Sequence, residues 1–270
     1  MGIVHRIGKK LFFGRFQKPW RWPQQVSESD WDRVSFRSGN GARLAAVFGS
    51  ARKEPAHGAV VLAHPMTVTA KGFWLKQGHA ELLRNAGFHV LAFDFNGFGE
   101  SESANFDYPS DVIAAGHYLR DRVSMPVGVI GCSFGAGYSL CAMEREDHPF
   151  RAAVLEGTFP TLPDYWRPYP LPHMALRISQ VVYPRLERTL RPLRAATQLK
   201  SKPHVLLIHG DADTITPIAA GHQLREAMSG HASVDVWTVP GADHTLALRA
   251  QPDDYARRVI DFLDAAFNRH

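Results

Sequence analysis

The chain of 270 residues is poor in cysteine and has only Cys132 and Cys141. The residues between them are expected to be largely helical and to span about 10 Å. A disulfide tolerates only about 7 Å between its Cα atoms. We therefore expect no disulfide, which is typical of a reducing compartment. The patterns C-x-x-C and H-E-x-x-H are also absent, so the sequence predicts no metal site. No glycine pattern of a dinucleotide or phosphate loop occurs, and we expect no cofactor.

The first 27 residues lack any acidic side chain and any apolar run longer than three residues. Such a run is too short for a signal-peptide core or a membrane span. Arg6 also stands where a myristoylation signal requires Ser or Thr. We therefore expect a cytoplasmic protein without a lipid anchor.

Residues 1–32 form a basic, aromatic arm for which two interpretations remain. The arm could contact an anionic membrane peripherally, or its Phe and Trp side chains could pack on the domain while Lys and Arg stay in solvent. Pro19 and Pro23 prevent a long amphipathic helix and favour packing. No nucleic-acid partner is expected, because no nucleic-acid reading motif is present.

The overall composition is that of a globular protein and excludes disorder and collagen. The chain has 45% hydrophobic and 21% charged residues, a net charge of +5 and a pI near 9.3. Its length allows one large domain or two small ones. The sequence leaves the oligomeric state open.

Short apolar runs alternate with helical patterns from residue 33 onward. A hairpin is predicted for 34–36 and 43–48, followed by five fully apolar strands and a last strand near 234–239. The five apolar strands are predicted at 59–63, 89–93, 127–130, 152–155 and 205–208. Helices are predicted near 71–86, 110–122, 134–145, 217–229 and 252–268. This alternation predicts an α/β fold with a mostly parallel sheet.

Residues 159–202 interrupt the alternation. They contain seven prolines and are too long for a structureless loop in a compact domain. We expect a helical lid with helices near 174–182 and 185–198, inserted into a core made of 33–158 and 203–270. The lid carries eight basic residues against two acidic ones, whereas the chain outside residues 1–27 and the lid has a net charge of −7.

Residues 131–135 read Gly-Cys-Ser-Phe-Gly and follow a predicted strand. This is the G-x-S-x-G pattern in the strand-turn-helix setting that it requires. The turn exposes the hydroxyl of Ser133, and the helix N-terminus stabilises developing negative charge. Ser133 is therefore the predicted nucleophile, while Cys132 is expected to be a small packing residue.

A serine nucleophile needs a histidine base and a carboxylate. His244 follows the last strand, on the sheet edge where Ser133 is also expected. Asp213 follows the strand 205–208 and is the favoured acid. Asp211 is an alternative that could instead hold the loop, and Asp243 and Glu156 are more remote alternatives.

The order Ser133, Asp213, His244 resembles that of the alpha/beta hydrolase superfamily, in its lid-bearing esterase, lipase and aminopeptidase-like branch. The resemblance covers about residues 33–268 and implies the alpha/beta hydrolase fold. It also implies an oxyanion hole formed by the backbone N–H groups of Met66 and Phe134. Pro65 stands where glycine is usual and cannot donate.

Two further residues of the resemblance are expected to have structural roles. His64 is interpreted as a residue that braces the oxyanion loop. Residues 94–101 resemble the family's D-x-R-G-x-G-x-S loop, with Asn96 where Arg is commoner. The replacement puts one local charge contact in doubt.

We predict a serine hydrolase that cleaves small or medium acyl esters. The alternatives are a thioesterase, an aminopeptidase-like hydrolase and a membrane-peripheral binding protein on a hydrolase fold. The lid offers side chains that could line an apolar acyl pocket or merely pack on the sheet. They are Tyr165, Trp166, Tyr169 and Met174, together with Leu171 and Ile178.

Overall fold

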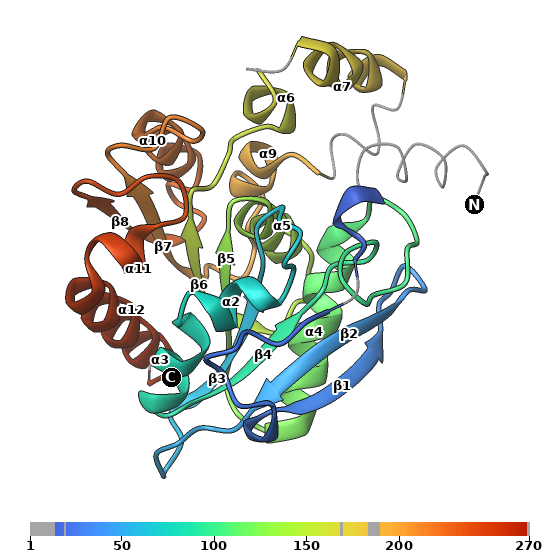
Figure 1. Cartoon of the computed structure of the whole chain (residues 1–270). Coiled ribbons are helices and arrows are strands. Elements are labelled where there is room, and N and C mark those ends of the chain that lie inside the picture. The colour runs from blue at the N-terminus through green and yellow to red at the C-terminus, as the bar shows by residue number, and fades with distance from the viewer. Residues whose placement is uncertain (1–13, 19, 168–169, 183–189, 269–270) are drawn as a thin grey trace.

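The computed structural model describes residues 14–18, 20–167, 170–182 and 190–268 (Figure 1). These residues form an eight-stranded sheet in the order β1-β2-β4-β3-β5-β6-β7-β8. Strand β2 runs antiparallel to β1 and β4, and all other pairs are parallel. The strands are β1 (Asp32–Arg37), β2 (Arg43–Gly49), β3 (Gly58–Ala63), β4 (Phe88–Phe93), β5 (Val127–Cys132), β6 (Phe150–Glu156), β7 (His204–Gly210) and β8 (Ser233–Val239). All eight predicted strands are confirmed.

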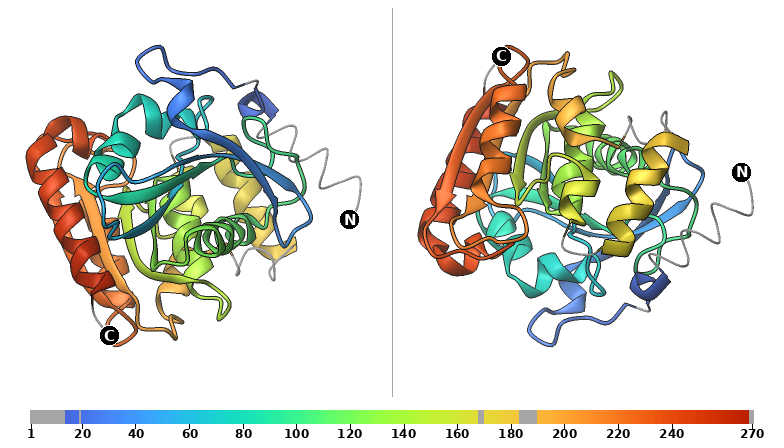
Figure 2. Two further views of the ribbon diagram at one scale, coloured as in Figure 1. Left: turned by 90° about the horizontal axis from the view of Figure 1, so that it is seen from below. Right: turned by 90° about the horizontal axis from the view of Figure 1, so that it is seen from above.

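Helices cover both faces of the sheet (Figure 2). Helices α4, α5, α9 and α10 contribute to one buried cluster, and α2, α3 and α12 to the other. Their bounds are α2 (Gly72–Lys76), α3 (His79–Asn85), α4 (Tyr108–Val123), α5 (Phe134–Met143), α9 (Pro192–Ala196), α10 (Ile218–Ala227) and α12 (Pro252–Phe267). The predicted alpha/beta hydrolase fold is confirmed by this architecture.

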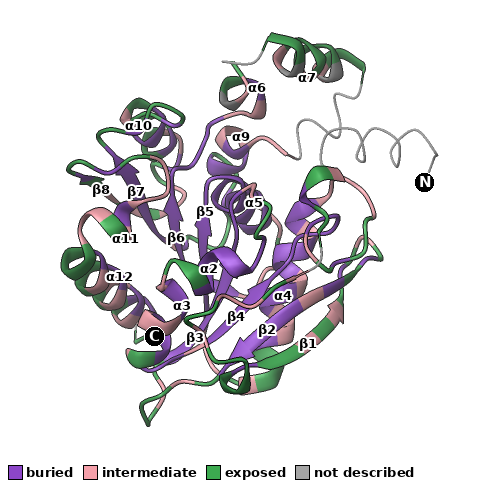
Figure 3. Cartoon of the chain, in the orientation of Figure 1, coloured by how far each residue is buried: buried purple, intermediate pink, exposed green. Residues whose placement is uncertain are grey.

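The central strands are apolar throughout because both of their faces are buried (Figure 3). In β3, Val61 belongs to the α4 and α5 side, whereas Val60 and Leu62 belong to the α12 side. Successive side chains of a strand point to opposite faces, so a continuous apolar run supplies two cores. Because these buried strands pair in parallel, their carboxyl ends lie at the same edge of the sheet.

The predicted helix 71–86 is wrong in one respect, because it is two helices. Helix α2 ends before Gly78, whose φ of +87° precedes α3. Glycine adopts this left-handed conformation without the steric cost of a side chain. The apolar pattern continues across the break, which is why it resembled a single helix.

The aromatic side chains of the described part of the arm pack on the domain. Phe16 is 6% exposed and stacks on Phe98 with 5.5 Å between ring centroids. Trp20 and Trp22 contact the second core cluster, and the Lys71 ammonium lies 4.5 Å from the Trp20 ring centroid. The packing interpretation is confirmed for these three aromatics. Residues 1–13 lie outside the described residues.

The insertion leaves the core after β6 and carries α6 (Leu162–Tyr165), α7 (Pro170–Val182) and α9. The predicted helix 174–182 is confirmed and begins four residues earlier, at Pro170. Of the predicted helix 185–198, residues 185–189 lie outside the described ones, and α9 covers only Pro192–Ala196. Pro192 lacks the backbone donor that a helix interior needs, so it occupies the first turn. Among the described helices, none has the length and apolar character needed to span a membrane.

Candidate active site

The predicted site residues lie beyond the carboxyl ends of neighbouring strands. Ser133 follows β5, Asp213 follows β7, and His244 lies between β8 and α11 (Ala247–Ala250). Strands β5 to β8 are adjacent and parallel. Residues far apart in the chain therefore meet at one sheet edge, as is usual for α/β proteins.

Ser133 occupies a strained turn between β5 and α5. Its φ is +51° and its ψ −110°, a region that side-chain-bearing residues rarely adopt. Its N–H donates to the backbone oxygen of Glu156 at 2.8 Å. A Cβ at Gly135 would lie 1.9 Å from the Ala63 oxygen, and one at Gly131 would lie 2.7 Å from Ala136 Cα. Both flanking glycines are thus required by close packing.

The three predicted triad side chains form one hydrogen-bonded series. Ser133 Oγ lies 2.9 Å from His244 Nε2, and His244 Nδ1 lies 2.8 Å from Asp213 Oδ2. The side chain of His244 is 13% exposed and that of Asp213 is 1% exposed. This geometry allows His244 to accept the serine proton while Asp213 orients the imidazole ring.

Asp213 is held as a carboxylate by its surroundings. Burial favours the neutral acid, but hydrogen bonds from His244 and Thr216 and the His244 charge outweigh it and lower the pKa of Asp213. Asp213 Oδ1 accepts the N–H groups of Ile215 and Thr216, each at 2.8 Å. These bonds fix the carboxylate facing His244.

The alternative acids take other positions. Asp211 is exposed and accepts the N–H of Gly241 at 2.6 Å, so it links the loops after β7 and β8. Asp243 is exposed and accepts the N–H of His244 at 2.7 Å. Glu156 is buried, and its side chain accepts the N–H of Ala247. Asp213 is the carboxylate that bonds to the imidazole Nδ1 atom.

Two residues that the sequence reasoning missed complete this environment. Thr216 Oγ1 donates to Asp213 Oδ2 at 2.7 Å and lies 3.1 Å from His244 Nδ1. A Cβ at Gly157 would lie 3.0 Å from His244 Cε1, and Gly157 has a φ of +61°. The signal for Gly157 was its position two residues after the predicted strand 152–155.

The predicted oxyanion residues belong to adjacent segments. Met66 follows β3 and Phe134 begins α5, which packs against the end of β3 at Gly135. His64 Nδ1 lies 2.7 Å from the Pro65 oxygen, and its Nε2 accepts the N–H of Phe95 at 3.2 Å. Burial lowers the pKa of His64 to about 4. The neutral ring therefore braces this loop, as expected.

Asn96 replaces the usual charge contact with amide hydrogen bonds. Its Nδ2 and backbone N–H donate to Asp111 Oδ2 at 2.6 and 2.9 Å. The adjacent Lys71 is 1% exposed and bonds to Asp94 Oδ2 at 2.6 Å and to Glu100 Oε2 at 2.9 Å. Buried charges require such partners. These contacts hold the segments beside the oxyanion loop.

The predicted pocket residues of the insertion differ in burial. Trp166 follows α6 and is half-buried, whereas Met174 on α7 is 55% exposed. Tyr165 lies in α6, but its side chain is outside the described part, and Tyr169 lies outside the described residues altogether. The acyl-pocket assignment therefore stays a prediction.

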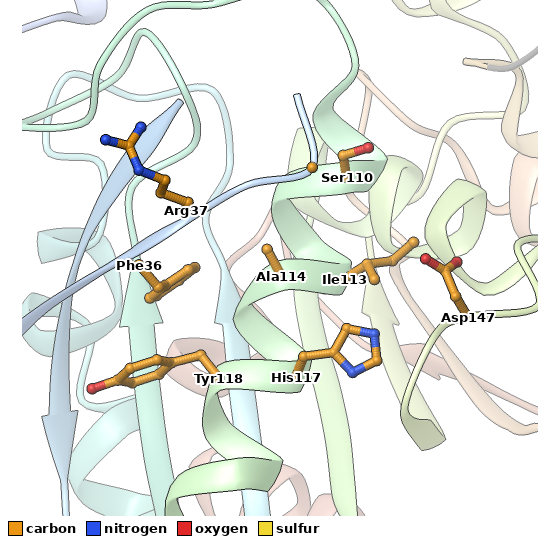
Figure 4. Close-up of a pocket in the computed structure, with 9 residues that line it drawn as sticks. Phe36, Arg37, Ser110, Ile113, Ala114, His117, Tyr118 and Asp147 are labelled. Carbon is orange, nitrogen blue, oxygen red and sulfur yellow. The ribbon is translucent and has the colours of Figure 1, made fainter. Parts of the chain in front are cut away.

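A cavity of about 380 Å³ lies between β1 and α4, and Figure 4 shows residues that line it. Its lining includes Phe36, Arg37, His117, Tyr118 and Asp147. None of the three triad residues lines it. The cavity consequently belongs to a different flank of the molecule from the candidate active site.

An eight-stranded α/β sheet with a serine elbow, a histidine and a buried aspartate defines the class as the alpha/beta hydrolases. Residues 75–270 match the prolyl oligopeptidase family. The chain therefore belongs to this family of serine hydrolases, and the predicted superfamily is confirmed.

Three known proteins show the breadth of the similarity. Human protein ABHD12B is 28% identical over 165 residues, which are 54% of this chain and 43% of that protein. Zebrafish lysophosphatidylserine lipase ABHD12 is 22% identical over 229 residues, 78% of this chain and 55% of that protein. The chain thus spans about half the length of these relatives. The Pyrococcus furiosus esterase Pf2001 has the same fold, with a TM-score of 0.72, 20% identity, and coverage of 93% of this chain and 100% of that one.

Proposed function

We propose that this protein hydrolyses carboxylic esters of small or medium acyl groups through an acyl-enzyme. The main support for this proposal is the hydrogen-bonded series from Ser133 through His244 to Asp213. In the proposed reaction Ser133 Oγ attacks the carbonyl carbon while His244 accepts its proton. His244 then returns the proton to the leaving alcohol, and water releases the acyl group by the same route.

The backbone N–H groups of Met66 and Phe134 are the proposed oxyanion donors. They lie on adjacent segments at the sheet edge that carries Ser133. Donors fixed before the reaction stabilise the developing oxygen charge without reorganising. The N-terminus of α5 adds a favourable dipole at the same place.

A panel of esters, thioesters and amino-acid amides with matched acyl groups tests the reaction class. We expect kcat/KM to be highest for p-nitrophenyl esters, and to vary with acyl length between two and twelve carbons. Purified protein is assayed at pH 8 by release of each leaving group. Preference for the amides would instead support peptidase activity, and equal rates for all acyl lengths would contradict an acyl pocket.

We also propose that the enzyme contacts anionic lipid surfaces. Seven large hydrophobic side chains are exposed in the described residues, and five lie on α7: Leu171, Met174, Ile178, Val181 and Val182. Their spacing of three and four residues places them along one stripe of the helix. The other two, Val68 and Ile215, lie near Met66 and Asp213 in the chain. An apolar stripe in this position supports contact with lipid.

The polar side of the insertion supports the choice of an anionic lipid. Arg167, Arg177 and Arg191 line a cavity of about 410 Å³ beside His173, with Asp164 as its acidic residue. Lipid phosphates attract such a basic surface, and salt screens the attraction. The arm's cationic residues would add to it.

Substitution of the stripe tests this contact. We expect Ile178→Glu with Val181→Glu to weaken binding to vesicles containing phosphatidylglycerol at least about tenfold, because two apolar side chains no longer enter the lipid. Cosedimentation measures binding. The control, Ala219→Glu with Gln223→Glu on exposed positions of α10, adds the same charge elsewhere. The proposal would be contradicted if vesicle binding by the wild type did not depend on salt concentration. It would also be contradicted if both double variants lost the same amount of vesicle binding.

A further inference from the structure

A second buried carboxyl lies beside the triad. Glu156 is the last residue of β6 and is 2% exposed. Its backbone oxygen accepts the N–H of Ser133 at 2.8 Å, and its Oε1 accepts the N–H of Ala247 at 2.9 Å. Ala247 begins α11, three residues after His244. One residue is therefore bonded to both the serine turn and the histidine loop.

The histidine loop needs anchors on both sides. Before His244, Asp211 accepts the N–H of Gly241 at 2.6 Å. After His244, Thr245 has a φ of +58°, which is a strained conformation for a β-branched residue. Surrounding contacts must hold such a conformation. The bond between Glu156 and Ala247 lies directly beyond this point.

The charge on Glu156 is also coupled to the site. Its neighbours among titratable groups are Cys132 on β5, Asp213, His244, and Tyr255 on α12. Burial raises the pKa of Glu156 to about 7, against the opposing effects of the Ala247 and Cys132 hydrogen bonds and the His244 charge. The carboxylate therefore forms as pH rises through neutrality, and its negative charge then interacts electrostatically with His244.

We propose that Glu156 is a positioning residue whose carboxyl holds the His244 loop against the serine turn. The inference rests on the proposed function in that Ser133 and His244 act together. Two properties of Glu156 are separable: an oxygen at Oε1 anchors Ala247, whereas the charge affects His244. A glutamine retains an oxygen acceptor without the charge, and a leucine retains much of the volume without the acceptor.

The rate at which a fluorophosphonate labels Ser133 measures the reactivity of this serine without requiring an ester substrate. For Glu156→Leu we expect this rate to fall about 10- to 100-fold, because small displacements of a catalytic group have effects of this order. For Glu156→Gln we expect a rate within about threefold of wild type at pH 8, and an acid limb of the pH profile moved to lower pH. The surface variant Glu146→Gln serves as the charge control and should behave as wild type.

The proposal is overturned if Glu156→Leu labels within about twofold of wild type, or if Glu156→Gln loses as much as Glu156→Leu. Thermal unfolding establishes that each variant is folded. Should the leucine variant not fold, the glutamine variant decides: because glutamine keeps the oxygen acceptor, a labelling rate at pH 8 more than about threefold below wild type overturns the proposal. A wild type that labels at Ser133 but cleaves no ester contradicts the proposed function and leaves this comparison intact.

Discussion

Ser133→Ala is expected to lower kcat for ester hydrolysis by about a millionfold, since the other triad members have no nucleophile to activate. The backbone bond from residue 133 to the Glu156 oxygen does not involve the hydroxyl and remains. We therefore expect the melting temperature to change little. Ester hydrolysis, fluorophosphonate labelling and thermal unfolding of the variant provide the three measurements.

Ser139→Ala is the matched control for this loss. Ser139 lies on α5, six residues further along the chain, and its fully buried hydroxyl makes no hydrogen bond in the structure. The same atom is removed in both variants, so Ser139→Ala should retain wild-type kcat. If Ser133→Ala still hydrolysed p-nitrophenyl acetate at the wild-type rate, the acyl-enzyme mechanism would be wrong.

Asp213→Asn is expected to lower kcat/KM by about 10⁴-fold. An asparagine oxygen can still accept the N–H groups of Ile215 and Thr216. Its amide group then faces His244 Nδ1 as a donor, which favours the tautomer that cannot accept the Ser133 proton. Initial rates at low substrate concentration measure the effect.

Asp211→Asn and Asp243→Asn are the controls for the choice of acid. Among the described residues both side chains bond only to backbone N–H groups of the histidine loop, and an amide oxygen can replace the carboxylate there. We expect each variant to remain within about threefold of wild type. A loss at either position as large as that of Asp213→Asn would refute the assignment of the acid.

The strands and the serine turn were predictable because local physical constraints determine them. Strands buried on both faces need continuous apolar runs, and the runs before Cys132 and Glu156 are of this kind. The serine turn leaves no room for side chains at positions 131 and 135, so the sequence carries glycine there. The break at Gly78 was missed because the apolar pattern crosses it.

The insertion shows where sequence reasoning was insufficient. An apolar residue such as Met174 can line a pocket, pack on the sheet or face solvent with the same local pattern. Its 55% exposure follows from how α7 lies relative to the core, which no short segment encodes. In the arm, by contrast, an aromatic side chain is buried. Phe16 packs on Phe98, which lies far from it in the sequence.

By itself, the sequence determined the α/β class, the order of serine, aspartate and histidine, and the turn that presents Ser133. These features follow from periodicity and from steric limits within a few residues. Only the tertiary structure decided that Asp213 rather than Asp211 or Asp243 bonds to the imidazole ring, and that Glu156 anchors a segment 91 residues away. Hydrogen bonds between distant segments depend on strand order and loop geometry, which local patterns do not specify.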